Sequence, residues 1–291
     1  MNRLPTILLV LACLSALGCA DDNRSATDDL EPFEPGAIDD LECTPDLDGE
    51  IRADQLQPAF GIPLNYRVSP DGEQRAVDLQ GFLDLDDRRV WDLDVDYGSD
   101  QRLQVVAQPL DDQWYADDFP DGEFTTVLDP TLDLDAVYSH DGQTLYLHGY
   151  ASATEHPPQG TTLAPYEEPV IAYDFPLEEG HTWSGTGAIR NGLVQGVTYS
   201  GDDHYDFEVD ATGRLWLPDI RFDSVLRVRT RLTIEPVVGQ RIYREQIQFL
   251  FECFGEVTRI VGPDRTLETD ETPPIDDYDF SMADHMRRLG F

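Results

Sequence analysis

Lysine is absent from the sequence, and this absence sets the electrostatic character of the chain. All 20 basic residues are arginine, and they stand against 58 aspartates and glutamates, so the formal net charge is −38. Such a chain repels nucleic acids and anionic lipid headgroups, and we exclude both as partners. We interpret the charge as a solvated surface suited to high salt, because salt screens most of the self-repulsion. Specific cation binding is the alternative.

Long hydrophobic runs are also missing. The main apolar run covers residues 7–17, whereas a helix needs ~20 apolar residues to span a bilayer. The run is therefore too short for a transmembrane helix. Its place between Arg3 and Gly18-Cys19 is typical of a signal peptide, so we expect residues 1–18 to be one and the chain to be exported.

The residues around the expected cleavage point sharpen this prediction. Ala16-Leu17-Gly18-Cys19 resembles the lipobox of bacterial lipoproteins, in which an aliphatic residue and two small residues precede a cysteine. The resemblance implies cleavage between Gly18 and Cys19 and a diacylglyceryl thioether on Cys19. Two positions depart from the common pattern, since Ala16 replaces the usual leucine and Leu17 is larger than the usual alanine or serine. An ordinary secretory signal with an incidental cysteine is the alternative.

The resemblance also implies a partner and a location. The partner is the lipid bilayer, entered through acylated Cys19, because two or three acyl chains anchor stably at ~0.8 kcal/mol per buried methylene. Ala20 rather than aspartate follows Cys19, which in enterobacterial lipoproteins favours the outer membrane. We therefore expect a lipid-anchored protein of the cell envelope, at the outer membrane, and the sequence leaves its periplasmic or surface face open.

Period-two alternation is clearest between residues 204 and 261. Tyr205, Phe207 and Val209 share one face, with polar residues between them, and the pattern continues over three later runs. Alternation of this length predicts half-buried antiparallel strands joined by short turns. We therefore predict an all-β fold, an antiparallel meander that forms a sandwich or an open barrel, either as one sheet or as two packed sheets.

We expect four regions along the chain. After the signal peptide, residues 19–45 are acidic and aperiodic, which predicts a disordered tether, and residues 46–262 form the β domain. Proline-rich residues 151–165 either divide that domain or form a long crossing loop within one sandwich. Residues 263–291 are predicted to be an acidic, disordered tail that ends in a short helix, because Met282, Met286 and Leu289 have helical spacing after a capping-box pattern.

The four cysteines reduce to two once the signal and the lipid anchor are accounted for. Cys13 lies in the signal peptide and Cys19 carries the lipid, which leaves Cys43 and Cys253. Two remaining cysteines in an oxidising compartment commonly pair. We therefore predict a Cys43–Cys253 disulfide, with two separate buried thiols as the alternative.

A run of aspartates raises the question of calcium, which prefers several oxygen ligands together. The candidate ligands are Asp92, Asp94, Asp96 and Asp100. Their spacing does not fit an EF-hand, because Gly98 is seventh from Asp92 and Leu103 stands at the twelfth position in place of glutamate. On a strand the first three share one face, which favours a solvated surface over a metal site.

Signals for catalysis are few. The chain has no Gly-x-Ser-x-Gly elbow, no His-Glu-x-x-His and no phosphate-binding glycine loop. Ser200, Asp202 and His204 are close in sequence, but triads are assembled across space. The acidic pairs Glu167-Glu168 and Asp202-Asp203 are expected by chance in this composition. We favour a non-catalytic domain without a cofactor, and an exported hydrolase with a site assembled from distant segments is the alternative.

Three arginines alternate with apolar or small residues and line one face of a predicted strand. They are Arg227, Arg229 and Arg231. In so acidic a chain we favour cross-strand pairing with carboxylates. The functional alternative is an anionic or carboxylate-bearing ligand held by an arginine fork.

The body of the chain resembles uncharacterised β-rich exported lipoproteins of Gram-negative bacteria. The resemblance lies in Phe-Pro-Leu…Gly…Trp between Phe175 and Trp183 and in Val-Leu-Arg-Val from Val225 to Val228, and it implies no activity. The sequence thus predicts an anchored envelope lipoprotein with a non-catalytic binding or structural β domain. A calcium-stabilised extracellular or periplasmic module is a further alternative.

Overall fold

The computed structural model describes residues 43–56, 60–267, 275 and 280–290. The signal peptide, Cys19 and the tether up to residue 42 lie outside the described residues, so those predictions stay predictions. Residues 43–291 form one compact unit. No helix among the described residues has the length and apolar character needed to span a bilayer.

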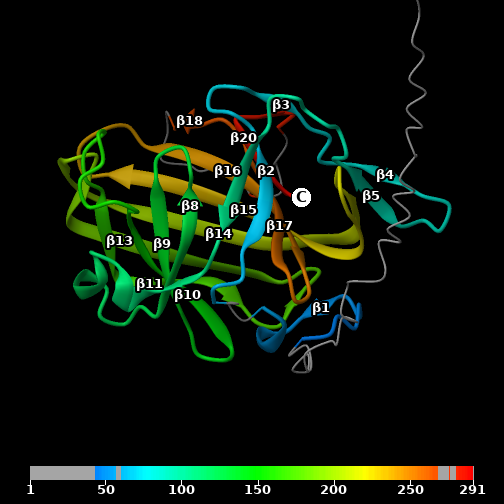
Figure 1. Ribbon diagram of the computed structural model, residues 1–291, viewed down its shortest axis with the longest axis horizontal. Coiled ribbons are helices and arrows are strands. Elements are labelled where there is room, and N and C mark those ends of the chain that lie inside the picture. The colour runs from blue at the N-terminus through cyan, green and yellow to red at the C-terminus, as the bar shows by residue number, and fades with distance from the viewer. Residues whose placement is uncertain (1–42, 57–59, 268–274, 276–279, 291) are drawn as a thin grey trace, which may run out of the picture. The chain divides into compact units, whose positions relative to one another are not determined.

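Strands are the predominant secondary structure of the described chain, which confirms the predicted all-β class (Figure 1). The first nine strands are β1 (Glu50–Ile51), β2 (Leu64–Val68), β3 (Arg75–Ala76), β4 (Phe82–Leu83), β5 (Arg89–Asp92), β6 (Gln101–Val105), β7 (Gln108–Pro109), β8 (Phe124–Asp129) and β9 (Leu134–His140). The next six are β10 (Thr144–Ser152), β11 (Leu163–Asp174), β12 (Leu177–Glu178), β13 (Thr182–Val194), β14 (Val197–Trp216) and β15 (Arg221–Pro236). The last five are β16 (Ile242–Phe251), β17 (Gly255–Val261), β18 (Arg265–Thr266), β19 (Met282–Ala283) and β20 (His285–Leu289). Three single-turn 3-10 helices complete the set, η1 (Ala53–Gln55), η2 (Leu110–Asp112) and η3 (Ala116–Asp118).

One 16-stranded sheet contains most of these strands, and its main path has the order β6-β2-β20-β17-β16-β15-β14-β13-β11-β10-β9-β8-β7. The other three strands branch from this path, since β18 pairs with β16, β5 with β14, and β4 with β5. The predicted meander is its centre, where β13 to β17 pair antiparallel in chain order. The strands β10 and β11, on either side of the proline-rich segment, also pair with each other. The segment that we considered as a division therefore joins two neighbouring strands of one sheet.

The sheet curves over on itself, so that β8 and β9 lie in front of the long strands in Figure 1. Two side chains bridge the space between. The Gln248 amide on β16 donates to the Tyr173 hydroxyl on β11 at 3.3 Å, and the Arg287 guanidinium on β20 donates to the Val127 carbonyl on β8 at 3.4 Å. The fold is therefore a sandwich made largely by one curved sheet.

The central strands are buried on both faces, whereas the alternation predicted half-buried strands. On β16, Phe249 belongs to one hydrophobic core and Leu250 to the other. The first core also holds Trp91 and Ile260, and the second holds Phe207. Charged residues of these strands, among them Arg227, Arg231 and Glu245, are buried as ion pairs. The pairing compensates for the loss of hydration on burial.

The predicted C-terminal helix is wrong. Residues 282–283 and 285–289 form β19 and β20, and β20 inserts between β17 and β2. Met286 and Leu289 are buried there, but so are their neighbours Arg287 and Arg288. Both sides of the segment find partners, and two open strand edges outweigh a helix too short to persist alone. The sheet therefore continues beyond residue 262, where we expected the β domain to end.

Candidate functional site

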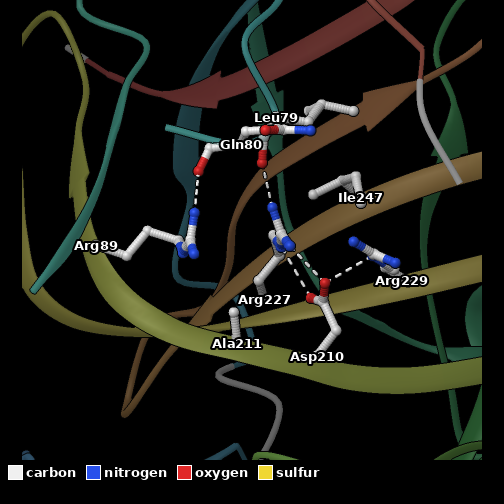
Figure 2. Close-up of a pocket in the computed structure, with 8 residues that line it drawn as sticks. All are labelled: Leu79, Gln80, Arg89, Asp210, Ala211, Arg227, Arg229 and Ile247. Carbon is white, nitrogen blue, oxygen red and sulfur yellow. Dashed lines mark hydrogen bonds and ion pairs between the residues drawn. The ribbon is translucent and has the colours of Figure 1, made fainter. Parts of the chain in front are cut away.

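An open cleft of about 300 Å³ lies where the β4–β5 hairpin meets the central sheet (Figure 2). It is lined by Leu79, Gln80, Arg89, Asp210, Ala211, Arg227, Arg229 and Ile247. These residues come from the segment before β4 and from β5, β14, β15 and β16. The cleft includes two of the three arginines predicted from the alternation.

Close approach of β5 to β14 forms one wall of this cleft. The two strands pair in parallel, with Arg214 opposite Val90. A Cβ atom on Gly213 would lie 2.6 Å from the Arg89 carbonyl oxygen and 2.7 Å from the Trp91 ring. Only glycine fits at this position, because the Cβ atom of any other residue would clash with the Arg89 backbone and the Trp91 ring at these distances. Gly213 therefore allows β5, and with it Arg89, to reach the cleft.

A β-bulge supplies the acid of the cleft. Val209 pairs with Val228 and Ala211 with Arg227, which leaves Asp210 as the extra residue between them. Bulges re-aim a side chain in this way. The Asp210 carboxylate accepts a hydrogen bond from Arg227 Nε at 2.8 Å and lies 2.6 Å from Arg229 Nε. One carboxylate is thus shared by two guanidiniums.

The Arg227 guanidinium contacts a carboxylate, a backbone carbonyl and an aromatic ring. Besides its two bonds to Asp210, it donates to the Leu79 carbonyl, and its guanidinium lies 5.0 Å from the centroid of the Trp91 ring. The Trp91 indole nitrogen donates to the same Leu79 carbonyl at 3.0 Å. Arg227 is therefore part of the scaffold that fixes the cleft floor.

The cleft carries an excess of positive charge in an otherwise acidic chain. Its lining contains three guanidiniums and one carboxylate, which leaves two positive charges in excess. Arg89 donates to the Gln80 carbonyl, and Figure 2 places Arg89 and Arg229 on opposite sides of the Arg227–Asp210 pair. Guanidiniums arranged in this way suit a carboxylate or another anion.

Arg231, the third arginine of the predicted face, lies away from the cleft. It is buried and pairs with Glu245 at 3.1 Å, and Glu245 also lies 3.8 Å from Arg265. Arg227, Arg229 and Arg231 thus all pair with carboxylates, as we favoured from the sequence. Arg227 and Arg229 also line the cleft.

The four aspartates considered for calcium face different partners. Asp92 and Asp94 are exposed, and the Asp92 carboxylate accepts the Asp94 backbone N–H at 3.2 Å. Asp96 pairs with Arg67 at 2.9 Å, whereas Asp100 pairs with Arg75 at 3.0 Å and Arg288 at 2.6 Å. The structure therefore does not gather these four carboxylates, and Asp100 is a buried structural anion.

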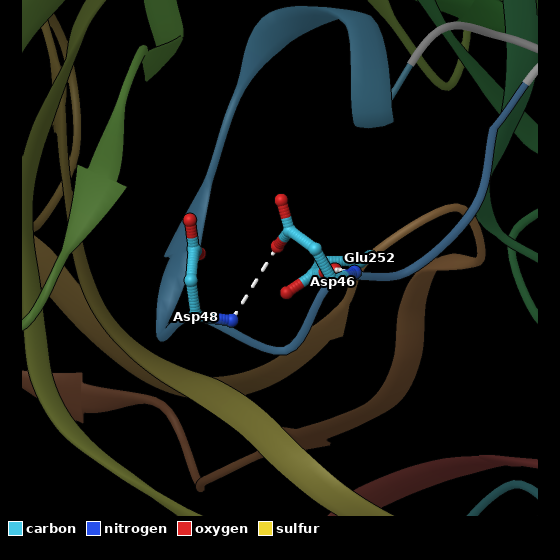
Figure 3. Close-up of side chains that lie close together, drawn as sticks. All are labelled: Asp46, Asp48 and Glu252. Atoms are coloured by element: carbon cyan, nitrogen blue, oxygen red, sulfur yellow. Dashed lines mark hydrogen bonds between the residues drawn. The ribbon is translucent and has the colours of Figure 1, made fainter.

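Cys43 and Cys253 form the predicted disulfide. A different set of acids comes together next to Cys253 (Figure 3). Among the described residues, Asp46, Asp48 and Glu252 are the group whose oxygen atoms all lie within 4.8 Å of one another. Glu252 is buried and accepts the backbone N–H groups of Asp46 at 2.6 Å and Leu47 at 3.1 Å. Arg52 pairs with both aspartates. The group fixes the start of the domain to the loop after β16. In the sequence, only the position of Glu252 next to Cys253 could have indicated it.

The side chains of Ser200, Asp202 and His204, which we considered for catalysis, contact different partners. The Ser200 hydroxyl accepts the Asn191 backbone N–H at 3.0 Å, Asp202 pairs with Arg190 at 2.7 Å, and His204 lies 2.9 Å from the Thr186 hydroxyl. Each group has its own partner on another residue, and the contacts do not link the three into a relay. Glu167 lies 3.9 Å from the same Arg190.

Asp203 faces the interior, and its partners are tyrosines. The side chain is 2% exposed, and its carboxylate accepts the Tyr166 hydroxyl at 2.9 Å, which lies 2.9 Å from the Tyr205 hydroxyl. Burial raises the pKa of Asp203 to about 6, against the hydrogen bond from Tyr166 that lowers it. Sequence reasoning placed Asp202 and Asp203 together, but the strand puts them on opposite faces.

Replacing Asp203 with asparagine should stabilise the protein at neutral pH. The folded state holds this proton more tightly than the unfolded chain, so the stability that protonated Asp203 contributes is present below pH 3.8 and is lost as pH rises through about 6. The Asp203→Asn variant stays neutral. Its unfolding free energy relative to the parent should therefore rise by about 2–3 kcal/mol between pH 4 and pH 8.

Urea unfolding at several pH values measures this difference. Asp202→Asn is the matched control, because it removes one negative charge from the neighbouring position, where the carboxylate pairs with Arg190. A difference between Asp203→Asn and the parent that stays constant from pH 4 to pH 8 would show that Asp203 is not a buried, proton-binding carboxyl.

Comparison of the chain with protein-family models, with curated proteins and with solved structures found no match.

Proposed function

We propose that this chain is an exported lipoprotein of the cell envelope, anchored at the outer membrane through acylated Cys19. Its β domain is a non-catalytic binding or structural module, and the acidic segment after Cys19 is its tether. The observation that carries most of the proposal is the Cys43–Cys253 disulfide, whose Cα atoms are 5.6 Å apart. Disulfides persist in oxidising compartments, so the bond supports export.

The disulfide also suits a domain held by its N-terminal end. It joins Cys43, the first described residue, to Cys253, which follows β16 in the central sheet. The Cys253 N–H donates to the Gln55 carbonyl at 2.8 Å, and Glu252 binds two backbone N–H groups near Cys43. A force applied through the tether would therefore reach the sheet through the covalent Cys43–Cys253 bond and would not have to be borne by the hydrogen bonds of β1.

The binding role is supported by the cleft beside β5. Its guanidiniums are positioned by a bulge, a glycine contact and an aromatic ring, all of which fix their geometry before any ligand arrives. Preorganised polar groups around open space are typical of ligand sites. The Ser200, Asp202 and His204 side chains, by contrast, bind separate partners, which favours binding over catalysis.

Replacing Cys19 with serine should remove the lipid-anchored mature form from the membrane fraction. The variant cannot form the thioether, so its signal is not processed by the lipoprotein route and no acyl chain is attached. We expect the parent in the membrane fraction and Cys19→Ser lost from it as a mature species, measured by fractionation and immunoblot. Cys13→Ser is the control, because it removes a thiol from the signal peptide and leaves the lipobox intact. Equal membrane retention of the cleaved, mature forms of the parent and Cys19→Ser would reject the anchor.

A further inference from the structure

We propose that the arginine-lined cleft binds a small, singly charged organic carboxylate. The inference deepens the proposed binding role and rests on it. The ligand would lie between Arg89 and Arg229, which flank the Arg227–Asp210 pair in Figure 2. Its carboxylate would meet the guanidiniums, and the rest of the molecule would extend toward the open side of the cleft.

The local charge is the first step of the argument. The whole chain has a formal net charge of −38, yet this cleft gathers three guanidiniums around one carboxylate. Asp210 neutralises one of them, so the cleft favours an anion locally while the rest of the protein repels anions at long range. An anion that binds here must gain more from contact with the guanidiniums than it loses on approach.

The second step is that the arginines of the cleft make different contacts. Arg227 is committed to the scaffold through Asp210, the Leu79 carbonyl and the Trp91 ring. Arg89 donates to the Gln80 carbonyl and, among the described residues, forms no ion pair. A guanidinium has five N–H donors, and this bond uses one of them. Arg89 is therefore the residue best placed to bind a ligand oxygen.

The charge of the ligand is the third step. Long-range repulsion from the acidic surface grows with the charge of the anion, so a phosphate dianion loses about twice as much on approach as a monocarboxylate. Asp210 adds a further repulsion at the site itself. Both effects favour one negative charge, and the planar guanidinium matches a carboxylate through two parallel hydrogen bonds.

The size and lining of the cleft limit the rest of the ligand. A volume of about 300 Å³ is at the small end of the range for ligand sites. Leu79 and Ile247 also line the cleft, but they are only 7% and 1% exposed, so the surface that a ligand can contact is mostly polar. These limits favour a carboxylate with a short chain, and butyrate is a suitable probe.

Isothermal titration calorimetry of the full chain in a non-ionic detergent, at moderate salt, tests the proposal with butyrate and inorganic phosphate as probes. We expect saturable binding of butyrate at one site and weaker binding of phosphate. Arg89→Gln should weaken butyrate binding about tenfold or more, because a charge-assisted pair is lost. Arg190→Gln is the control, since it removes the same charge from β13, outside the cleft, and should change binding by less than twofold.

A second variant tests the location without changing any charge. Ala211→Leu places three further carbon atoms in the cleft, opposite Arg227, and should also weaken butyrate binding about tenfold. Circular dichroism confirms that each variant is folded. Absence of saturable butyrate binding, tighter binding of phosphate, or equal affinities in the parent, Arg89→Gln and Ala211→Leu would overturn the proposal. Titration and membrane fractionation are separate measurements. A negative titration would reject ligand binding in the cleft without rejecting the lipid anchor, and a negative fractionation would reject the lipid anchor without rejecting the cleft as a binding site.

Discussion

Replacing Asp100 with alanine should lower the free energy of unfolding by about 3–5 kcal/mol, the usual cost of removing one partner from a buried ion pair. The Asp100 side chain is 5% exposed and lies between Arg75 and Arg288, whose side chains are 4% and 1% exposed. Without the carboxylate, Arg288 keeps the carbonyl oxygens of Leu93 and Val95 and the face of the Tyr97 ring as partners among the described residues. A buried guanidinium would then lack a counter-charge.

The neighbouring Asp96 provides a matched control for this prediction. It also pairs with an arginine, Arg67, but its side chain is 74% exposed, and exposed pairs contribute only about 0–1 kcal/mol. Asp96→Ala should therefore lower the unfolding free energy by less than about 1 kcal/mol. Urea unfolding suits both variants, because urea leaves the ionic strength unchanged. Similar losses for Asp96→Ala and Asp100→Ala would contradict the buried position of Asp100.

Removing the disulfide should be comparably destabilising. Cys43 and Cys253 are 210 residues apart in sequence, and the chain-entropy model gives roughly 5 kcal/mol for closing so long a loop, with about 2–5 kcal/mol typical of measured native disulfides. We expect the double variant Cys43→Ala, Cys253→Ala to lose stability within this range. Urea unfolding of parent and double variant measures the loss.

Reductant gives an internal control for the disulfide. A thiol reductant should destabilise the parent to about the level of the double variant and leave the double variant unchanged, because Cys43–Cys253 is the bond it breaks. Titration of thiols in the denatured, unreduced parent should find neither cysteine free. Two free thiols at these positions would contradict the bond and, with it, the main support for export.

The local pattern of the sequence is sufficient for the central strands and for the disulfide. Alternation at Tyr205, Phe207 and Val209 predicts β14 because each strand residue turns to the opposite face from its neighbour. The Cys43–Cys253 pair followed by elimination of the other two cysteines. Both arguments use information carried by a few residues near one another, or by a simple count.

The end of the chain shows where local pattern is not enough. Met286 and Leu289 have helical spacing with Met282, but β20 lies between β17 and β2, which are far from it and from each other in sequence. Whether these residues become strand or helix depends on two open edges that only the folded sheet provides. Burial of Arg287 and Arg288 beside them also depends on partners from other segments.

The cleft has the same mixture of predictable and unpredictable parts. The shared face of Arg227 and Arg229 follows from alternation, and so does their need for carboxylates in an acidic chain. Asp210 belongs to the cleft only because of a bulge, and Arg89 only because β5 packs in parallel on β14. Neither contact leaves a local signal, since a bulge moves one residue out of the alternating pattern and the parallel pairing joins distant segments.

Mass spectrometry of the N-terminal peptide of the mature protein, isolated from membranes, tests the central claim most directly. The account predicts a chain that begins at Cys19 and carries the added mass of a diacylglyceryl group, with or without a further acyl chain. An unmodified Cys19 on a chain recovered from the membrane-free fraction would contradict it.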